Sequence, residues 1–404
     1  MFRSNRFFDR RCLMFRHRST GGASALASRD SVATEVTRWT HGFRLLTSAA
    51  TGSGLVGSLA LPNDENLHSP GPGAIFIWLR RFSEAGSFVT CRPGCPRYTP
   101  AMRVLIVGCG YVGLPLGAEL VKQGHEVIGV RRTQDAEAEL KAAGIQPLVA
   151  DITKPEDLAK LPAPFDWVVN AVSSSKGGVE EYRQVYLNGT RNLIEWLTPT
   201  PPKKFVYTSS TSVYGRTDGS LVKETSPTEP ASETGKVLVA AEKLLLGAVA
   251  DGKFSAVLLR VAGIYGPGRG HLFLKYLKGE AKMTGKGERL INMIHRDDLI
   301  GIIMATLKNG RPGEIYNAVD DEPVAQIHFF RWLSETLGKW MPPFAAEAEA
   351  GDHKRGLTNK RVSNRRLKME LGYQFKYPTF RQGYTAEMTR LEREGKLDIN
   401  LEAR

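Results

Sequence analysis

Short apolar runs alternate with amphipathic stretches along the chain from residue 102 onward. Runs rich in β-branched residues predict buried strands over residues 102–107, 126–130, 146–150, 167–171, 204–208, 256–261 and 313–319. Apolar positions at helical spacing predict helices over residues 112–123, 181–197 and 232–249. Strands that alternate with helices are typical of a doubly wound parallel sheet. We therefore predict an α/β fold in which this sheet is the main element.

A glycine-rich loop directly follows the first predicted strand. The motif G-x-G-x-x-G places Gly108, Gly110 and Gly113 between a strand and a helix, with a second strand close behind. In this context Gly108 permits a tight turn, Gly110 lets the backbone approach a pyrophosphate, and Gly113 allows close packing of helix and strand. The helix N-terminus then points its N–H groups at the phosphates. The loop predicts a dinucleotide site that also includes Tyr111 and Val112.

The end of the second strand bears on the choice of cofactor. An NAD-binding protein usually has Asp or Glu here, to bind the ribose hydroxyls. This chain has Arg131, Arg132 and Thr133 instead. Two guanidinium groups and a hydroxyl suit a 2′-phosphate, because Arg offers charged bidentate donors. The sequence therefore favours NADP over NAD, and the alternative is a pair of solvated loop arginines.

The next strands also end in candidate ligand contacts. Asp151 follows the third strand, and Ala171 and Val172 lie at the end of the fourth. Ligands of doubly wound sheets bind beyond the carboxyl ends of the strands. We therefore expect these three residues to contact the cofactor as well.

The charge is distributed unevenly along the chain. The 404 residues hold 55 Lys and Arg against 42 Asp and Glu, a formal net charge of +13. Residues 1–100 contain 13 Arg, no Lys and six acidic residues, so this part carries +7 and the remainder +6. The remainder lacks the combination of basic and aromatic residues that marks an RNA-binding surface. Nucleic acid is therefore not an expected partner, although an RNA- or anion-binding role remains a third hypothesis.

Residues 1–101 show little hydrophobic periodicity and are rich in Arg and Ser. We interpret them as a poorly structured extension, or as the product of an upstream mistranslated start. An organellar transit segment is the alternative. The expected location is the cytoplasm, or the mitochondrion or chloroplast if the extension is a transit segment. No run of about 18 apolar residues occurs, so no membrane-spanning helix is expected.

Four further segments resemble the extended short-chain dehydrogenase/reductases, specifically the sugar-nucleotide epimerase/dehydratase group. They are residues 207–215 (Tyr-Thr-Ser-Ser-Thr-Ser-Val-Tyr-Gly), 259–269, 294–299 and 363–373. The resemblance implies a Rossmann-type cofactor domain over residues 102–261. It implies that residues 262–404 form mainly a smaller substrate lobe, with elements returning to the first domain. It also implies a small-molecule substrate such as a nucleotide-sugar, and a homodimer.

The family uses a Ser or Thr, a Tyr and a Lys as its catalytic set. Ser210 matches the Ser/Thr by its distance from Tyr214, and would polarise the reacting oxygen. Counting back from the helix residue Glu242 puts Thr234 at the Tyr position and Leu238 at the Lys position. No Tyr-x-x-x-Lys occurs anywhere in the chain. The resemblance is therefore to atypical members, in which the dinucleotide site is kept and the acid/base pair is lost.

Other groups could replace the missing pair. Thr234 retains a hydroxyl for hydrogen bonding, and Tyr214 is a candidate proton donor. Arg269 is a candidate for binding a substrate phosphate, and His295 is a candidate substrate contact. No metal site is predicted. The first hypothesis is an NADP-dependent oxidoreductase or isomerase with an altered acid/base set, and the second is a catalytically silent NADP-binding sensor or regulatory protein.

Overall fold

The predicted strands form one seven-stranded sheet in the computed structural model, which describes residues 100–174, 177–345 and 358–397. The strand order is β11-β7-β5-β4-β1-β2-β3, and every neighbouring pair is parallel. The bounds are β1 Arg103–Val107, β2 Glu126–Arg131, β3 Gln146–Val149, β4 Trp167–Asn170, β5 Lys204–Ser210, β7 Ala256–Val261 and β11 Ile315–Ala318. The predicted doubly wound parallel sheet is confirmed.

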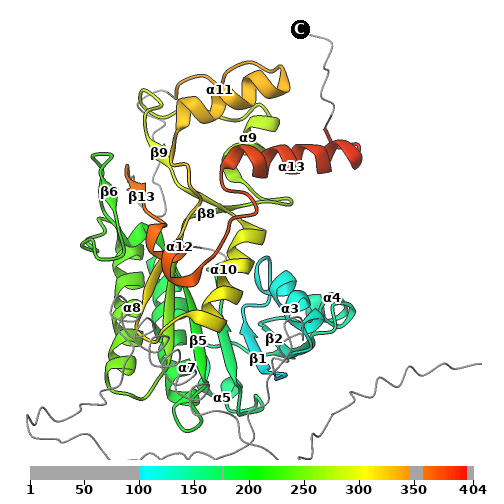
Figure 1. Cartoon of the computed structure of the whole chain (residues 1–404), viewed down its shortest axis with the longest axis vertical. Coiled ribbons are helices and arrows are strands. Elements are labelled where there is room, and N and C mark those ends of the chain that lie inside the picture. Colours follow the sequence, from blue (N-terminus) through cyan, green and yellow to red (C-terminus); the bar gives the residue numbers. More distant parts are fainter. Residues whose placement is uncertain (1–99, 175–176, 346–357, 398–404) are drawn as a thin grey trace, which may run out of the picture. The chain divides into compact units, whose positions relative to one another are not determined.

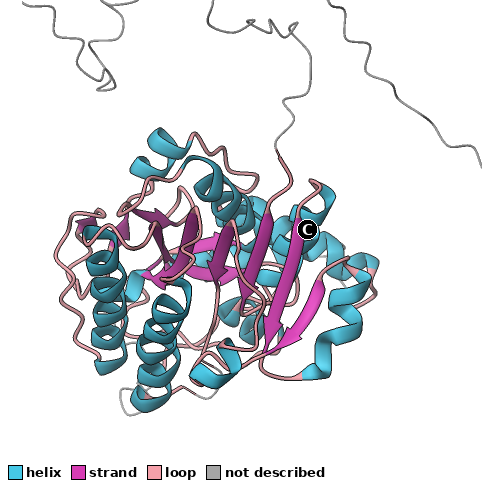
Figure 2. Ribbon diagram, turned by 90° about the horizontal axis from the view of Figure 1, so that it is seen from below, coloured by secondary structure: helices cyan, strands magenta, loops and turns pink. Residues whose placement is uncertain are grey.

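Both faces of this sheet are covered by helices, as Figure 2 shows. Side chains alternate along β1, so that Val104 and Ile106 join one apolar core while Leu105 and Val107 join the other. The first core includes residues of α3 (Gly113–Lys122), α4 (Glu137–Ala142), α10 (Arg296–Asn309) and α12 (Arg365–Leu371). The second includes residues of α5 (Pro155–Leu158), α7 (Gly189–Leu197) and α8 (Glu233–Ala250).

Two of the differences between predicted and observed elements lie beside the site. The predicted helix over residues 181–197 is divided into α6 (Val179–Tyr182), a π-helical segment (Arg183–Asn188) and α7. Such widened turns are frequent at functional sites. Strand β5 extends two residues beyond its predicted end, to Ser210, and a short 3-10 turn over Thr211–Val213 follows it. Another 3-10 turn, Gln134–Ala136, precedes α4.

A smaller lobe is built on an aromatic core. Its helices are α9 (His271–Leu277), α11 (Gln326–Leu337) and α13 (Phe380–Arg393), labelled in Figure 1. Their buried side chains include Phe273, Phe329, Phe330, Phe380 and Tyr384. Three two-stranded sheets complete the fold, and they pair β8 (Gly263–Tyr265) with β10 (Met293–His295), β9 (Leu290–Ile291) with β12 (Val324–Ala325), and β6 (Leu221–Val222) with β13 (Arg361–Val362).

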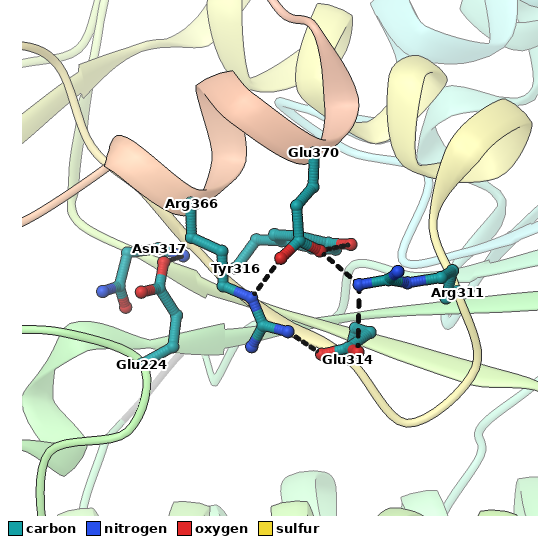
Figure 3. Close-up of polar contacts among 7 residues, drawn as sticks. All are labelled: Glu224, Arg311, Glu314, Tyr316, Asn317, Arg366 and Glu370. Atoms are coloured by element: carbon teal, nitrogen blue, oxygen red, sulfur yellow. Dashed lines mark hydrogen bonds and ion pairs between the residues drawn. The ribbon is translucent and has the colours of Figure 1, made fainter. Parts of the chain in front are cut away.

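Late segments of the chain return to the sheet. Strand β11 pairs with β7 at the sheet edge, and α12 packs beside it. Figure 3 shows how charged side chains join α12 to the segment that leads into β11. Glu370 of α12 accepts from Arg311 at 2.9 Å and from the Tyr316 hydroxyl at 3.0 Å, and Arg366 bonds both Glu370 and Glu314. These contacts hold α12 on the sheet edge.

The predicted N-terminal extension lies outside the described residues, apart from its last two positions. The proposed division at residue 261 stays a prediction, because the described residues all belong to one unit, Arg97–Arg404. Among the described residues, no helix has both the length and the apolar character needed to cross a bilayer.

Candidate active site

The glycine loop turns tightly between β1 and α3. Gly108 has a φ of +83°, and a Cβ on it would lie 2.7 Å from the Val172 backbone nitrogen. A Cβ on Gly113 would lie 2.8 Å from the Gly108 carbonyl oxygen and 2.9 Å from Ile106 Cγ2. A Cβ on Gly110, in contrast, would meet no protein atom within 4 Å. The first and third glycines therefore serve close packing, and the second leaves open space at a helix N-terminus, where a pyrophosphate fits.

A cavity of about 410 Å³ lies at the carboxyl ends of the strands. Every predicted cofactor contact except Gly113 lines it: Gly108, Gly110, Tyr111, Val112, Arg131, Arg132, Asp151, Ala171 and Val172. The structure thus brings together residues from the ends of β1, β2, β3 and β4. Their arrangement fits an extended dinucleotide that crosses the sheet edge.

The end of β2 presents a positive group to this cavity. Arg131, Arg132 and Thr133 all line it. The Arg131 guanidinium lies 3.8 Å from the Asp135 carboxylate, and both side chains are partly exposed. Such an exposed pair is weak, so it leaves Arg131 able to bind a ligand.

Ser210 also lines the cavity, at the end of β5. Its Oγ accepts the Ser212 backbone N–H at 3.2 Å and thereby caps the turn that follows. A hydroxyl has one proton to donate and two acceptor positions. The turn fixes Ser210 Oγ while the proton can still be donated to a bound oxygen, as the polarising role requires.

The two residues that stand at the positions of the missing acid/base pair, Leu238 and Thr234, have different surroundings. Leu238 lines the cavity, so an apolar side chain stands where the family has its Lys. Thr234 is buried in the first turn of α8, and its hydroxyl lies 3.4 Å from Ser232 Oγ. Thr234 is not among the residues that line the cavity. Its catalytic role stays a prediction.

Tyr214 is held in a buried polar network. Its hydroxyl donates to Asn317 Oδ1 at 2.9 Å and accepts from Arg260 Nη1 at 2.8 Å. Arg260 in turn makes a buried ion pair with Glu242, with 2.7 Å between Nη2 and Oε2. Glu242 also accepts from Ser209 Oγ at 2.6 Å. The phenol of Tyr214 is therefore occupied in the core, where burial raises its pKa, and it does not line the cavity.

The two predicted substrate contacts have different positions. Arg269 lines the cavity, and its guanidinium lies 4.9 Å from the centre of the Tyr111 ring. His295 is the N-cap of α10, where its Nδ1 accepts the Asp297 backbone N–H at 3.1 Å. Burial lowers the pKa of His295 to about 4, so the ring is neutral. Arg269 therefore lies at the cavity and His295 caps a helix, and both substrate roles stay predictions.

Several cavity residues were not predicted from the sequence. They include Thr153, Val185, Tyr186, Thr208, Ser209, Ile264 and Leu299. Tyr186 lies in the π-helical segment, and its hydroxyl accepts the Ser174 backbone N–H at 3.1 Å. This widened turn is not visible in the pattern of apolar residues, so it could not mark Tyr186 from the sequence.

Known proteins resemble this chain over most of the described fold. Residues 104–318 match the NAD dependent epimerase/dehydratase family. Protein YeeZ of Escherichia coli K12 is 30% identical over 283 residues, which cover 68% of this chain and 96% of YeeZ. A dTDP-6-deoxy-L-talose 4-dehydrogenase (NAD(P)+) of Kitasatospora kifunensis is 33% identical over 188 residues, covering 44% of this chain and 58% of that protein.

Among solved structures, the dTDP-glucose 4,6-dehydratase DesIV of Streptomyces venezuelae, with NAD bound, superposes with a TM-score of 0.64. It is 21% identical, and the match covers 73% of this chain and 98% of DesIV, so it supports the fold. The sequence match to the family spans more than half of the chain. By its sequence and its fold, this chain belongs to the NAD-dependent epimerase/dehydratase family of extended short-chain dehydrogenase/reductases.

Proposed function

We propose that the protein is an NADP-dependent oxidoreductase or isomerase that acts at a hydroxyl or carbonyl group of a nucleotide-sugar. The observation that carries this proposal is the cavity of about 410 Å³ that both the glycine loop and Ser210 line. A bound nicotinamide cofactor would supply hydride exchange at its C4 atom. The chain itself would hold the cofactor, orient the substrate and bind its reacting oxygen.

The preference for NADP rests on the end of β2. Arg131 and Arg132 line the cavity there, and no described carboxylate contacts the cavity from the end of β2 itself. A 2′-phosphate bound by two guanidiniums makes charge-assisted hydrogen bonds, which are stronger than those between neutral groups. The ribose hydroxyls of NAD would gain much less from the same arginines.

Replacing Arg131 with Ala should therefore weaken NADPH binding far more than NADH binding. Hydrogen bonds to charged groups contribute about 1.5–3 kcal/mol, so we expect the NADPH Kd to rise roughly 10- to 100-fold. Cofactor fluorescence on the full chain measures both constants. Lys141→Ala, which removes an exposed cation of α4, is the control and should change neither constant. Tighter binding of NADH than of NADPH by the unaltered protein would refute the assignment.

The nucleotide-sugar part of the proposal is supported by a second cavity. It has a volume of about 620 Å³ and is lined by Thr211, the residue after Ser210. Basic side chains dominate its charged lining: Lys275, Lys282, Arg289 and Lys360. A cationic cavity beside the end of β5 suits an anionic substrate, such as a sugar linked to a diphosphate.

A catalytically silent NADP-binding protein is the second candidate. It is favoured by Leu238, because a leucine in the cavity can neither donate a proton nor lower the pKa of a neighbour. A panel of dTDP- and UDP-linked sugars and their keto derivatives, followed by NADPH absorbance, separates the two candidates. Turnover of any member supports the enzyme. Tight NADPH binding without turnover on the whole panel supports the silent protein.

A further inference from the structure

The second cavity has a buried lysine in its wall. Lys360 is only 3% exposed, and its Nζ donates to the Tyr214 carbonyl oxygen at 2.9 Å and to Thr358 Oγ1 at 2.8 Å. Both acceptors are neutral. None of the ion pairs found among the described residues includes Lys360. A buried ammonium without a carboxylate partner is costly, which favours a specific use for this group.

The backbone around Lys360 is fixed by its neighbours. The Asn292 side chain donates to the Lys360 carbonyl oxygen and accepts from the Val362 N–H, each at 2.9 Å. The Arg361 N–H donates to the Ser220 carbonyl oxygen at 2.9 Å, which starts the pairing of β13 with β6. In Figure 1, these two strands lie side by side beyond the end of the main sheet. The amine is therefore held at a defined place in the cavity wall.

One turn joins this lysine to the predicted catalytic serine. Ser210 Oγ caps the turn Thr211–Val213 at its start, and the Tyr214 carbonyl at its end accepts from Lys360 Nζ. Ser210 lines the cofactor cavity, and Thr211 lines the second cavity together with Lys360. The serine hydroxyl and the lysine amine thus flank the segment where the two cavities approach each other.

The surroundings of Lys360 allow it to exchange a proton near neutral pH. Burial lowers the pKa of its amine to about 8. The other charged or titratable groups that line the cavity are His271, Lys275, Lys282 and Arg289, with Glu280 as the carboxylate. Burial alone accounts for the direction of the shift. General acid/base groups are most effective when their pKa lies near the working pH.

We propose that Lys360 is the acid/base residue of this active site, where its side-chain amine exchanges a proton with the reacting oxygen of the substrate. The inference rests on the proposed oxidoreductase function. When a carbonyl is reduced, an N–H bond of the Lys360 ammonium breaks, an O–H bond forms on the substrate, and the carbonyl carbon gains the hydride carried by NADPH. In the oxidation of an alcohol, the neutral amine takes the hydroxyl proton and the hydride leaves to NADP+. Lys360 thus supplies the proton transfer for which Leu238 has no titratable group and Thr234 has only a weakly acidic hydroxyl.

Labelling of the full chain with pyridoxal 5′-phosphate tests this without a known substrate. Its aldehyde condenses with a neutral amine, water leaves, and borohydride reduces the imine to a stable amine that peptide mass spectrometry locates. An exposed lysine with a pKa near 10.4 is almost fully protonated at pH 7.5, so Lys360 should be labelled at least about tenfold faster than exposed Lys243. Its rate should rise with pH to a plateau above about pH 8. Labelling no faster than at Lys243 would overturn the proposal.

Kinetics with a nucleotide-sugar from the panel supply the second test. Lys360→Arg keeps the positive charge and the N–H donors but cannot lose its proton, so kcat should fall by roughly 100-fold or more with little change in KM. In the unaltered protein, kcat for reduction should fall as the pH rises through about 8, because the ammonium form is needed. Lys275→Met, which removes a charge from the same cavity, should raise KM and keep this pH dependence. An unchanged pH profile in Lys360→Arg would overturn the proposal.

The two proposals fail in different ways. Absence of NADPH binding would refute the proposed function itself. Normal NADPH binding by the full chain, with Lys360 labelled no faster than exposed lysines, would refute only the role of the lysine. A urea unfolding curve of Lys360→Arg that matches the unaltered protein shows that the loss of turnover is not a loss of fold.

Discussion

Replacing Glu242 with Ala should lower the free energy of unfolding by about 3–5 kcal/mol, because it leaves the buried Arg260 cation without its counter-charge. Glu242 is 2% exposed and Arg260 4% exposed. The guanidinium bonds both carboxylate oxygens, with Nε at 3.1 and 3.2 Å and Nη2 at 2.7 Å. Urea unfolding followed by circular dichroism measures the loss.

The same helix provides a matched control. Lys236 and Glu233 of α8 form an ion pair of 2.6 Å in which both side chains are more than half exposed. Lys236→Ala should therefore change the unfolding free energy by no more than about 0.5 kcal/mol. The double variant Glu242→Leu with Arg260→Met removes both charges and should recover part of the loss. A loss below about 1 kcal/mol in Glu242→Ala would show that the pair does not stabilise the fold in this way.

This ion pair explains why the helix glutamate is present although the catalytic pair is absent. Glu242 accepts from Ser209 Oγ, and Arg260 donates to the Tyr214 hydroxyl. Ser209 lines the cofactor cavity, and Tyr214 ends the turn that Ser210 caps. The pair therefore fixes both ends of the segment in which the candidate serine lies. Its function in this chain is positional and does not require the missing Tyr and Lys.

The cofactor half of the site could be predicted because its signals are local in sequence. A strand, a glycine loop and a helix are adjacent along the chain, and each of Gly108, Gly110 and Gly113 has its own spatial requirement. Strand ends also predict contacts, since parallel strands meet at one edge of the sheet. Arg131 and Asp151 were found in this way, and both line the cavity.

The second cavity, which we propose for the substrate, could not be predicted from the sequence as a unit, because distant segments assemble it. The second cavity joins the end of β5, helix α9, strand β9 and residues Thr358 and Lys360 near the C-terminus. Lys360 contacts the Tyr214 carbonyl across 146 positions of sequence. No periodicity or spacing marks a lysine for burial, since most lysines are solvated. Tyr214 is the opposite case, because its motif suggested a site residue and its hydroxyl is bound in the core.

Replacing Gly110 with Ala should reduce dinucleotide affinity by roughly 100-fold or more, about 2.7 kcal/mol, while the free energy of unfolding stays within about 0.5 kcal/mol. The added methyl group would meet no protein atom within 4 Å, and Gly110 lines the cavity. The added methyl group would therefore occupy open space in the cavity, which a bound dinucleotide needs. Fluorescence titration with NADPH and a urea unfolding curve measure the two effects separately.

Substitutions at two other glycines distinguish a loss of ligand binding from a change in packing or stability. Gly108→Ala should lose both affinity and stability, because its Cβ would lie 2.7 Å from a backbone nitrogen at a φ of +83°. Gly247→Ala, in helix α8 with no atom within 4 Å, should keep its affinity and gain about 0.5–1 kcal/mol of stability. If Gly110→Ala bound NADPH as tightly as the unaltered protein, the pyrophosphate could not lie against this loop. The cofactor would then have to bind away from the α3 N-terminus. The assignment of its 2′-phosphate to Arg131 and Arg132 at the end of β2 would then lose its basis.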